Sequence, residues 1–358
     1  MSLFKVEVCQ IESILPHHNA DRLALAQLTN NAYQFIIAKD SYQVGDQVVY
    51  FPLDSLLPDK LIEQLGLTDK LANSTVDGLK HRNRIRTVRL RGVISQGLVA
   101  RLNELDLDPA VWPVGSNLTD QLSVSKYEPP VPLDKSGQLI GLPPLVSVYD
   151  LENAENFSTL ITRELLNQPV AVTEKLEGSH WGLALSSTDT LSLLQRRYAI
   201  QDYENHTWWR ATLQADLPAK IITLRNLLNQ TRSKPINLLT LRGEIVGPAI
   251  QGNLYRLTQH AIYVFEIEID GQPIDAIDFQ CQVANLHLTS VPLLSHGSQT
   301  LHEWLAGRSL RDASNGHSAL ADVLREGIVI KPLMERNALP LGRIVLKQRS
   351  PDYLANEK

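Results

Sequence analysis

Short stretches of alternating hydrophobic and polar residues fill the first third of the chain, a pattern typical of β-strands joined by turns. We expect strands at residues 6–14, 23–28, 33–38, 44–51, 84–90 and 97–99. Many short strands in succession predict a small β-barrel or β-sandwich.

A proline-rich stretch separates this region from the rest of the chain. Prolines occupy positions 129, 130, 132, 143 and 144. Because proline lacks a backbone N–H and disfavours helix and central-strand interiors, this stretch is the best candidate for a linker. We therefore divide the chain into a first domain at 1–126, a linker at 127–150 and a second domain at 151–358.

The second domain mixes helical and strand patterns. Helices are expected at 151–167, 208–213, 217–229 and 280–286. Strand-like segments lie at 170–173, 181–185, 190–194, 238–241, 261–269, 327–330 and 344–346. The mixture predicts an α+β domain around a mostly antiparallel sheet.

Composition and charge narrow the class of protein. Hydrophobic residues make up 43% of the 358 residues and charged residues 20%, which favours folded cores over disorder. A net charge of −5 argues against nucleic-acid binding over the whole surface, so a polyanion site must be local. Two distant cysteines make a disulfide scaffold implausible. Neither a signal-peptide pattern nor an apolar run of membrane-spanning length is evident, so we expect a cytoplasmic protein without a membrane partner.

The segment from Glu174 to Gly178 is the most informative for chemistry. Lys175 follows an apolar strand, and strand alternation places Lys175 and Glu177 on one face. Gly178 permits a turn and the close approach of a ligand. A lysine attacks as a nucleophile only when it is unprotonated, which neighbouring cations or desolvation favour. Because so short a motif is common, the alternative is a solvated surface lysine.

Four later segments add candidates. Glu244 lies at a strand end between two glycines, Phe265 lies inside a strand, and Glu326 precedes a glycine and an apolar strand. Lys347 ends the last strand. Each has a structural alternative, since carboxylates cap turns, Phe265 can belong to the core and Lys347 can be solvated. The order of all five segments is far more specific than any one of them.

That order resembles the motif series of covalent nucleotidyltransferases, the superfamily of DNA ligases, RNA ligases and mRNA capping enzymes. The stretch at 243–253 resembles the RNA ligase branch. The stretches at 18–23, 45–54 and 89–98 resemble the OB domain of the fifth RNA ligase family. The resemblance implies an N-terminal OB-like β-barrel followed by an antiparallel-sheet adenylyltransferase domain of the ligase type, unrelated to ATP-grasp enzymes.

The resemblance also implies ATP as cosubstrate and a role for each motif residue. Lys175 would attack the α-phosphorus, Glu326 would engage a metal or its water shell, and Lys347 would contact the α-phosphate. Glu177 and Glu244, with Arg196 or Arg197, would hold the sugar, and Phe265 would stack on adenine. The full set of implied nucleotide contacts is Glu174, Lys175, Leu176, Glu177, Gly178, Arg196, Glu244, Phe265, Lys331 and Lys347.

A divalent cation is implied as well. Mg²⁺ or Mn²⁺ would bind near Glu326 and Glu244, because carboxylate oxygens suit these metals. The sequence departs from the family pattern at two places. Glu177 stands where aspartate is commoner, and the second cation of the last motif falls on the position of Val345 or of Arg349, depending on alignment.

A basic stretch in the first domain is the candidate for nucleic-acid contact. Residues 80–101 contain seven lysines and arginines and no acidic residue. A basic strand on an OB barrel suits backbone phosphates, whereas the alternative is a solvated or internally paired strand. The predicted phosphate-binding residues are Arg82, Arg84, Arg86, Arg89 and Arg91.

The resulting hypothesis is an ATP-dependent RNA ligase that acts on nicked RNA or RNA/DNA duplexes in RNA repair, with a monomer favoured. Two other functions stay open. One is a DNA ligase or another nucleotidyltransferase, although a capping enzyme is disfavoured because there the OB module follows the catalytic domain. The other is a catalytically inactive OB-fold nucleic-acid-binding protein, against which the retained motif residues argue.

Overall fold

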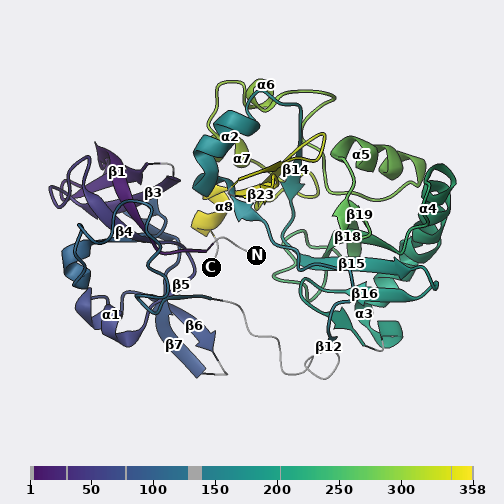
Figure 1. Cartoon of the computed structure of the whole chain (residues 1–358), viewed down its shortest axis with the longest axis horizontal. Helices are drawn as coiled ribbons and strands as arrows, with labels where there is room; N and C mark the ends of the chain where they lie inside the picture. The colour runs from purple at the N-terminus through teal and green to yellow at the C-terminus, as the bar shows by residue number, and fades with distance from the viewer. Residues whose placement is uncertain are drawn as a thin grey trace. The chain divides into compact units, whose positions relative to one another are not determined.

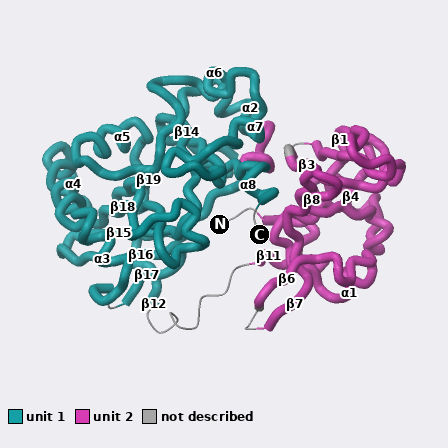
Figure 2. The backbone as a smooth tube through the Cα atoms, turned by 180° about the vertical axis from the view of Figure 1, so that it is seen from behind, with its two compact units in different colours: residues 1, 133–153, 160–356 teal, residues 2–132, 154–159, 357–358 magenta. Residues whose placement is uncertain are grey.

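The computed structural model describes residues 4–29, 31–76, 79–127, 139–201, 203–339 and 341–356. These residues form two compact units, shown in different colours in Figure 2. The N-terminal unit comprises mainly residues 2–132 with 154–159, and the C-terminal unit mainly residues 133–153 and 160–356. Much of the predicted linker, at 128–138, lies outside the described residues.

Two sheets of short antiparallel strands build the N-terminal unit (Figure 1). In sheet order the first contains β10 (Leu98–Arg101), β4 (Gln47–Phe51), β1 (Glu7–Pro16), β2 (Leu23–Leu28) and β3 (Asn31–Ala38). The second contains β11 (Ser125–Lys126), β5 (Ser55–Leu56), β7 (Leu79–Arg84) and β6 (Ala72–Val76). The alternating burial of β2 shows how one face of each strand is covered while the other is more open.

Two apolar clusters fill this unit. One gathers Val49, Phe51 and Leu102, and the other gathers Ile11, Ala26 and Phe35. Neighbouring residues of one strand pack in different clusters, because successive side chains point to opposite faces of the sheet. The remaining elements are α1 (Asp59–Gln64), the 3₁₀ turns η1 (Leu102–Leu105) and η3 (Ala154–Phe157), and the hairpin of β8 (Val88–Leu90) and β9 (Val93–Ser95).

A seven-stranded antiparallel sheet forms the larger layer of the C-terminal unit. Its strands, in order, are β12 (Leu139–Ile140), β17 (Ala199–Ile200), β16 (Leu191–Leu194), β15 (Ser179–Ser186), β18 (Leu238–Val246), β19 (Ala261–Ile269) and β20 (Gln272–Pro273). Three helices share one apolar core with this sheet: α3 (Thr207–Gln214), α4 (Leu217–Thr231) and α5 (Ala276–Asn285). Trp208, Ile221 and Phe279 carry the helical side of that core. They pack against strand residues such as Trp181 and Val264, which are fully buried.

A smaller sheet carries the strand ends on which the candidate chemistry lies. Its order is β13 (Glu152–Asn153), β24 (Leu346–Arg349), β21 (Gly327–Pro332) and β14 (Val170–Lys175). β21 runs antiparallel to both of its neighbours, and β13 runs parallel to β24. The shorter elements of the unit are α2 (Ser158–Glu164), η4 (Tyr203–Asn205), α6 (Leu301–Leu305), α7 (Leu310–Ser314), α8 (Pro351–Asn356) and the hairpin of β22 (Asn337–Ala338) and β23 (Gly342–Arg343).

The predicted α+β class with a mostly antiparallel core is confirmed, but two segments differ. In place of one strand at 84–90, β7 ends at Arg84 and β8 begins at Val88. The helix expected at 151–167 is instead a short strand, a 3₁₀ turn and the helix α2. Pairing of Glu152 and Asn153 with β24 uses backbone groups that a helix would have needed for itself. Within the described part of the chain, no helix has the length and apolar character to cross a bilayer.

Candidate active site

Three neighbouring strands place Lys175, Gly327 and Arg349 in one transverse row. Gly327 on β21 pairs with Lys175 at the end of β14 and with Arg349 at the end of β24. Paired residues point to the same face, so Lys175 and Arg349 flank a position without a side chain. A Cβ at Gly327, whose φ is +156°, would lie 2.1 Å from the carbonyl oxygen of Gln348, so this position requires glycine.

Glu326, directly before this row, joins the two cations. Its Oε2 accepts a hydrogen bond from Lys175 Nζ at 2.6 Å, and its Oε1 lies 3.5 Å from Arg349 Nε. The side chains of Lys175 and Arg349 are 25% and 31% exposed, against 11% for Glu326. We call these three residues the strand-end cluster. A carboxylate between two accessible cations is suited to binding a polyphosphate and its metal.

The last strand settles which residue of the final motif reaches this cluster. Val345 is 4% exposed and belongs to the interior. Lys347 pairs with Val329, two residues along β21 from Gly327, and therefore points to the same face as Lys175. Of the two positions that the sequence left open for the second cation, the geometry favours Arg349.

Two tyrosines hold the turn that follows β14. The backbone N–H of Glu177 donates to the hydroxyl oxygen of Tyr255 at 2.7 Å, and Glu177 Oε2 accepts a hydrogen bond from the Tyr353 hydroxyl at 2.5 Å. Gly178 lets the turn pack closely, because a Cβ there would lie 2.6 Å from the carbonyl oxygen of Ile245. The carboxylate of Glu177 is therefore anchored by a side chain from the C-terminal helix α8.

Glu244 on β18 lies within electrostatic reach of the strand-end cluster. Burial raises the pKa of Glu244 to about 8, with Lys175 opposing the shift and Glu326 adding to it. The carboxyl group therefore holds its proton at neutral pH until a cation or another ligand stabilises the charged form. So large a shift beside a lysine and a second carboxylate is typical of a functional site.

Phe265 occupies a β-bulge. Arg242 pairs with Glu266 and Gly243 with Val264, which leaves Phe265 as an extra residue on β19. Val264 belongs to the apolar core, whereas Glu266 forms buried ion pairs. The bulge thus frees Phe265 from the regular alternation of the strand.

The ring of Phe265 belongs to an aromatic group. Its centroid lies 5.1 Å from that of Tyr149 and 5.8 Å from that of His180, and Tyr149 stacks on His180 at 5.2 Å. The carbonyl oxygen of Tyr149 accepts a hydrogen bond from Arg196 Nε at 2.9 Å. Burial, assisted by neighbouring arginines, lowers the pKa of His180 to about 3, so its imidazole is neutral. Arg196 and Phe265 are thereby connected through the main chain and ring of Tyr149.

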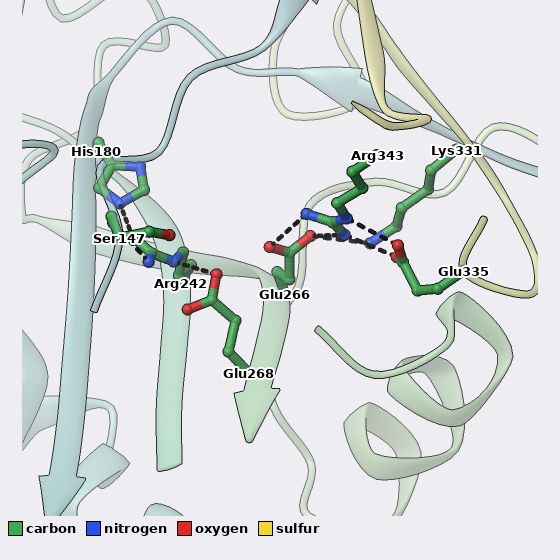
Figure 3. A network of polar contacts seen from close by, with 8 residues as sticks. All are labelled: Ser147, His180, Arg242, Glu266, Glu268, Lys331, Glu335 and Arg343. Atoms are coloured by element: carbon green, nitrogen blue, oxygen red, sulfur yellow. Dashed lines mark hydrogen bonds and ion pairs between the residues drawn. The ribbon is translucent and has the colours of Figure 1, made fainter. Parts of the chain in front are cut away.

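A network of buried ion pairs supports the strand behind Phe265 (Figure 3). Lys331 Nζ donates to the carbonyl oxygen of Phe265 at 3.1 Å and lies 3.9 Å from Glu266 Oε2. Arg343 donates to Glu266 Oε1 at 3.0 Å and to Glu335 Oε2 at 2.7 Å. We call this the buried network. The nucleotide contact implied for Lys331 stays a prediction, since here its ammonium is engaged with β19.

Arg242 extends this pattern on β18 (Figure 3). The side chain is fully buried, and its Nε donates to Glu268 Oε1 at 2.7 Å. A second nitrogen donates to the carbonyl oxygen of Ser147 at 2.9 Å, and a third lies 3.5 Å from His180 Nε2. Arg242 therefore fixes His180 and the segment that leads to Tyr149.

Glu174 and Leu176 alternate with Lys175 and point into the protein. Glu174 is 1% exposed, and its Oε2 accepts a hydrogen bond from the N–H of Ala319 at 2.8 Å. Leu176 is 3% exposed and packs with Val246. Their implied nucleotide contacts stay predictions, and in the structure both side chains hold the strand end in place.

The arginines predicted to contact phosphate lie on or beside two short strands of the N-terminal unit, β7 and β8: Arg82, Arg84, Arg86, Arg89 and Arg91. Arg84 lies 2.6 Å from Asp54 Oδ1 and stacks 4.1 Å over the ring of Tyr127. Arg82 lies 3.4 Å from Asp69 Oδ1. The other three arginines are exposed. Their role toward nucleic acid stays a prediction.

The residues present fit a divalent cation that shares its ligands with a substrate. Among the described residues no group of three or more His, Cys, Asp or Glu side chains could enclose a metal. Glu244 and Glu326 nevertheless interact electrostatically, and both offer hard oxygen donors. Mg²⁺ and similar ions are commonly held by one or two carboxylates, with water and phosphate oxygens completing the shell.

Comparison with known families decides the class of protein. A family model described as RNA ligase matches residues 168–348, about half of the chain. The chain belongs to the RNA ligase family. A second model, described as an OB-fold domain, matches residues 5–102. The OB-like domain that the sequence predicted ahead of a ligase-type nucleotidyltransferase domain is confirmed.

Solved structures similar to this RNA ligase extend the match to nearly the whole chain. A mutant of a Naegleria gruberi RNA ligase with ATP and Mn is 26% identical, with 98% of each chain covered and a TM-score of 0.79. The same ligase with PPi is 26% identical at a TM-score of 0.78, again with 98% of each chain covered. Another mutant, without ligand, is 27% identical at a TM-score of 0.79 and covers 100% of this chain and 99% of its own. No curated protein sequence matches the chain.

Several residues of the candidate site had no sequence signal of their own. Tyr255 and Tyr353 reach Glu177 from distant segments, and Tyr149 lies outside every motif. Glu266 follows Phe265 directly, but regular alternation would place one of the two on the core side. A bulge cannot be inferred from alternation, whereas Arg349 could be found because it was one of two aligned alternatives.

Proposed function

We propose that this RNA ligase uses ATP to form a covalent lysyl-AMP on Lys175 and then seals a 5′-phosphate end to a 3′-OH end. The observation that carries the proposal is the strand-end cluster, in which Lys175 and Arg349 meet at one carboxylate. The lysine is partly exposed and fixed in direction, as an attacking group must be. It differs from an ordinary surface lysine because two strands and a required glycine define its position.

The proposed reaction has three successive steps. The Lys175 amine loses its proton and attacks the α-phosphorus of ATP, which forms an N–P bond and releases pyrophosphate. A 5′-phosphate oxygen of the nucleic acid then attacks the same phosphorus, and the N–P bond breaks. A 3′-hydroxyl finally attacks the activated 5′-phosphate, forms the phosphodiester and releases AMP.

Residues around Lys175 support the nucleotide in this proposal. Glu177 and Glu244 face the sugar, with Arg196 nearby, and Phe265 stacks on the adenine, a contact typically worth about 1–3 kcal/mol. Lys347 shares the face of Lys175 and contacts the α-phosphate. The Naegleria gruberi RNA ligase with ATP, with AMP and with Mn supports nucleotide and metal use in a protein of this fold.

Glu326 has to exchange partners during the first step. In the structure its carboxylate accepts a hydrogen bond from Lys175 Nζ at 2.6 Å, so the amino group is engaged before a nucleotide binds. A divalent cation, when bound, neutralises the polyphosphate charge and polarises the phosphorus. Glu326 and Glu244 would hold this cation, and Glu326 would then release the Lys175 amino group for attack.

Nicked RNA or RNA/DNA duplexes are the substrates that we propose, with RNA repair in the cytoplasm as the setting and a monomer as the working form. The exposed arginines of the N-terminal unit suit a duplex backbone, whose recognition is electrostatic and independent of sequence. The OB-fold model over residues 5–102 supports this substrate class.

Covalent labelling tests the proposal. The protein is incubated with Mg²⁺ or Mn²⁺ and ATP labelled in the α-phosphate, and then denatured. We expect label on the wild type and on Lys60→Ala, a change at an exposed lysine on α1, but not on Lys175→Ala. Absence of label on the wild type with both metals would refute an adenylyl-transfer enzyme.

The nucleic-acid substrate needs a separate assay. Labelled protein is mixed with nicked duplexes that carry RNA or DNA on the 3′-OH side of the nick. Faster sealing with RNA on that side is expected. Equal sealing of an all-DNA nick would contradict the proposed RNA specificity and indicate a general polynucleotide ligase.

A further inference from the structure

The contact between Tyr353 and Glu177 joins the C-terminal helix to the segment that carries Lys175. The Tyr353 hydroxyl donates to Glu177 Oε2, and the guanidinium carbon of Arg349 lies 5.7 Å from the centre of the Tyr353 ring. Arg349 in turn lies beside Glu326. Tyr353 therefore touches both sides of the candidate site, although it lies beyond the last motif.

The position of Tyr353 is fixed by Ser350, which is fully buried. The N–H of Ser350 donates to the carbonyl oxygen of Glu326 at 2.8 Å, and its hydroxyl donates to Asn315 Oδ1 at 2.8 Å. The Ser350 hydroxyl oxygen also accepts from the N–H of Tyr353 at 3.2 Å. The start of α8 is thus tied to the residue before Gly327, so Tyr353 is held in register with the strand-end cluster.

The second oxygen of Glu177 lies next to Gly252. A Cβ built on Gly252 would lie 3.9 Å from Glu177 Oε1, and glycine has no side chain to occupy that space. One oxygen of the carboxylate is therefore used by Tyr353. Within the described part of the chain, and apart from the residues adjacent to Gly252, the other is the one heavy atom within 4 Å of the Cβ position of that glycine. A carboxylate with one oxygen committed presents the other in a defined direction.

The identity of residue 177 explains why such an anchor matters. Glutamate has one more rotatable bond than aspartate, so its carboxylate samples more positions and loses more entropy when a ligand binds. A hydrogen bond from a fixed hydroxyl removes much of that freedom before the ligand arrives. In this chain the longer residue and the tyrosine lie together.

We propose that Tyr353 is a positioning residue that aims Glu177 Oε1 at a ribose hydroxyl of the nucleotide and thereby sets the preference for ATP over deoxynucleotides. The proposal rests on the adenylyl-transfer function proposed above. The ribose hydroxyl donates to Oε1, while the Tyr353 hydroxyl keeps Oε2. A nucleotide that lacks the hydroxyl leaves the carboxylate oxygen without its donor and loses affinity.

The test compares rates of lysyl-AMP formation at varied concentrations of ATP, 2′-deoxyATP and 3′-deoxyATP. Tyr353→Phe keeps the ring over Arg349 and removes only the hydroxyl. We expect the KM for ATP to rise about tenfold with kcat changed less than about threefold, and the preference for ATP over one of the two deoxynucleotides to fall by a similar factor. The matched control, Tyr203→Phe, alters a tyrosine that packs edge-on against Trp209, and should change neither quantity.

A double-variant comparison separates positioning from support of the fold. Glu177→Asp shortens the side chain beyond the reach of the Tyr353 hydroxyl, so adding Tyr353→Phe to it should change the KM less than about twofold. An additive loss in the double variant, or an equal loss with all three nucleotides, would overturn the positioning role. Wild-type labelling with an unchanged Tyr353→Phe variant would overturn this inference alone, whereas a wild type that takes no label would overturn the proposed function with it.

Discussion

The C-terminal unit contains two groups of paired charges that are alike in composition and unlike in position. The buried network joins Arg343 and Lys331 to Glu266, and these three side chains are 25%, 7% and 1% exposed. The strand-end cluster joins Lys175 and Arg349 to Glu326, and the three side chains are 25%, 31% and 11% exposed, so each is more exposed than Lys331 or Glu266. One carboxylate between two cations is therefore not by itself evidence of an active site.

The difference lies in what surrounds each group. Glu266 follows a bulge within β19, and its partners fasten that strand to the segments around β21 and β23. Glu326 precedes Gly327, which pairs with Lys175 and Arg349 at the two neighbouring strand ends and puts no side chain between them. Buried pairs hold structure together, whereas accessible pairs at strand ends can exchange one partner for a ligand.

Breaking the buried network should produce the largest effect on stability. Glu266→Ala leaves the buried Lys331 ammonium without its carboxylate partner, whereas Arg343 keeps Glu335, so we expect unfolding free energy to fall by about 3–5 kcal/mol. Urea unfolding followed by tryptophan fluorescence measures this change. Glu204→Ala, an exposed control, should stay within about 0.5 kcal/mol of the wild type. A loss below about 1 kcal/mol for Glu266→Ala would contradict a scaffolding role.

Neutralising the strand-end cluster should affect chemistry rather than stability. Glu326→Gln keeps the shape of the side chain but removes its charge, and we expect lysyl-AMP formation to slow about 100-fold, roughly 2.7 kcal/mol in barrier height. Quenched labelling with ATP gives the rate, and the urea midpoint should hardly move. An unchanged rate would show that the charge of Glu326 is not needed for chemistry. A loss of stability as large as that of Glu266→Ala would show that the strand-end cluster supports the fold as the buried network does.

The pH dependence of stability offers a finer test at Glu244. Its folded pKa is raised to about 8 by burial, whereas the unfolded value is about 4.5, so the folded chain retains a proton that the unfolded chain has released. Glu244 therefore lowers the free energy of unfolding as the pH rises from about 4.5 to about 8. Glu244→Gln removes the titration. Between pH 6 and pH 8 the unfolding free energy of the variant should rise relative to that of the wild type, by at most about 2 kcal/mol. Parallel curves for the two proteins in urea unfolding would refute the shift.

The smallest predicted effect is on the salt dependence of duplex binding. It concerns the arginines of the N-terminal unit, where paired and exposed side chains can again be compared. Arg89→Ala should lower the salt dependence of duplex binding by about one unit of slope, because an exposed arginine releases one counterion. Arg84→Ala should lower it less, since Asp54 and Tyr127 already hold that guanidinium. Fluorescence anisotropy with a nicked duplex at several salt concentrations measures both. A larger effect for Arg84 would show that its internal pairs open when nucleic acid binds.

The sequence identified the family and most of the strand ends because both depend on local pattern. The strands predicted at 170–173, 261–269 and 327–330 correspond to β14, β19 and β21, since runs of branched apolar residues bounded by glycine or charge are locally decisive. The helix expected at 151–167 was wrong in its first half. There, pairing with a distant strand outweighs local preference.

The parts of the site that escaped prediction depend on long-range contacts. Tyr353 meets Glu177 across 176 residues of sequence, and no spacing rule connects them. The bulge at Phe265 changes the alternation of the strand, so the inward direction of the Glu266 side chain could not be predicted from the sequence. Lys331 illustrates the opposite limit, because it belongs to a motif while its ammonium is engaged by the carbonyl oxygen of Phe265.

The central claim is that Lys175 itself carries the adenylyl group. Wild-type protein incubated with ATP and Mn²⁺ can be digested at neutral or alkaline pH, where the acid-labile N–P bond survives, and its peptides can be sequenced by mass spectrometry. We predict one adenylyl group on the peptide that contains Lys175, removed by added pyrophosphate and absent from Lys175→Arg. An adenylyl group on another residue, or a Lys175→Arg protein that is still labelled, would contradict the account.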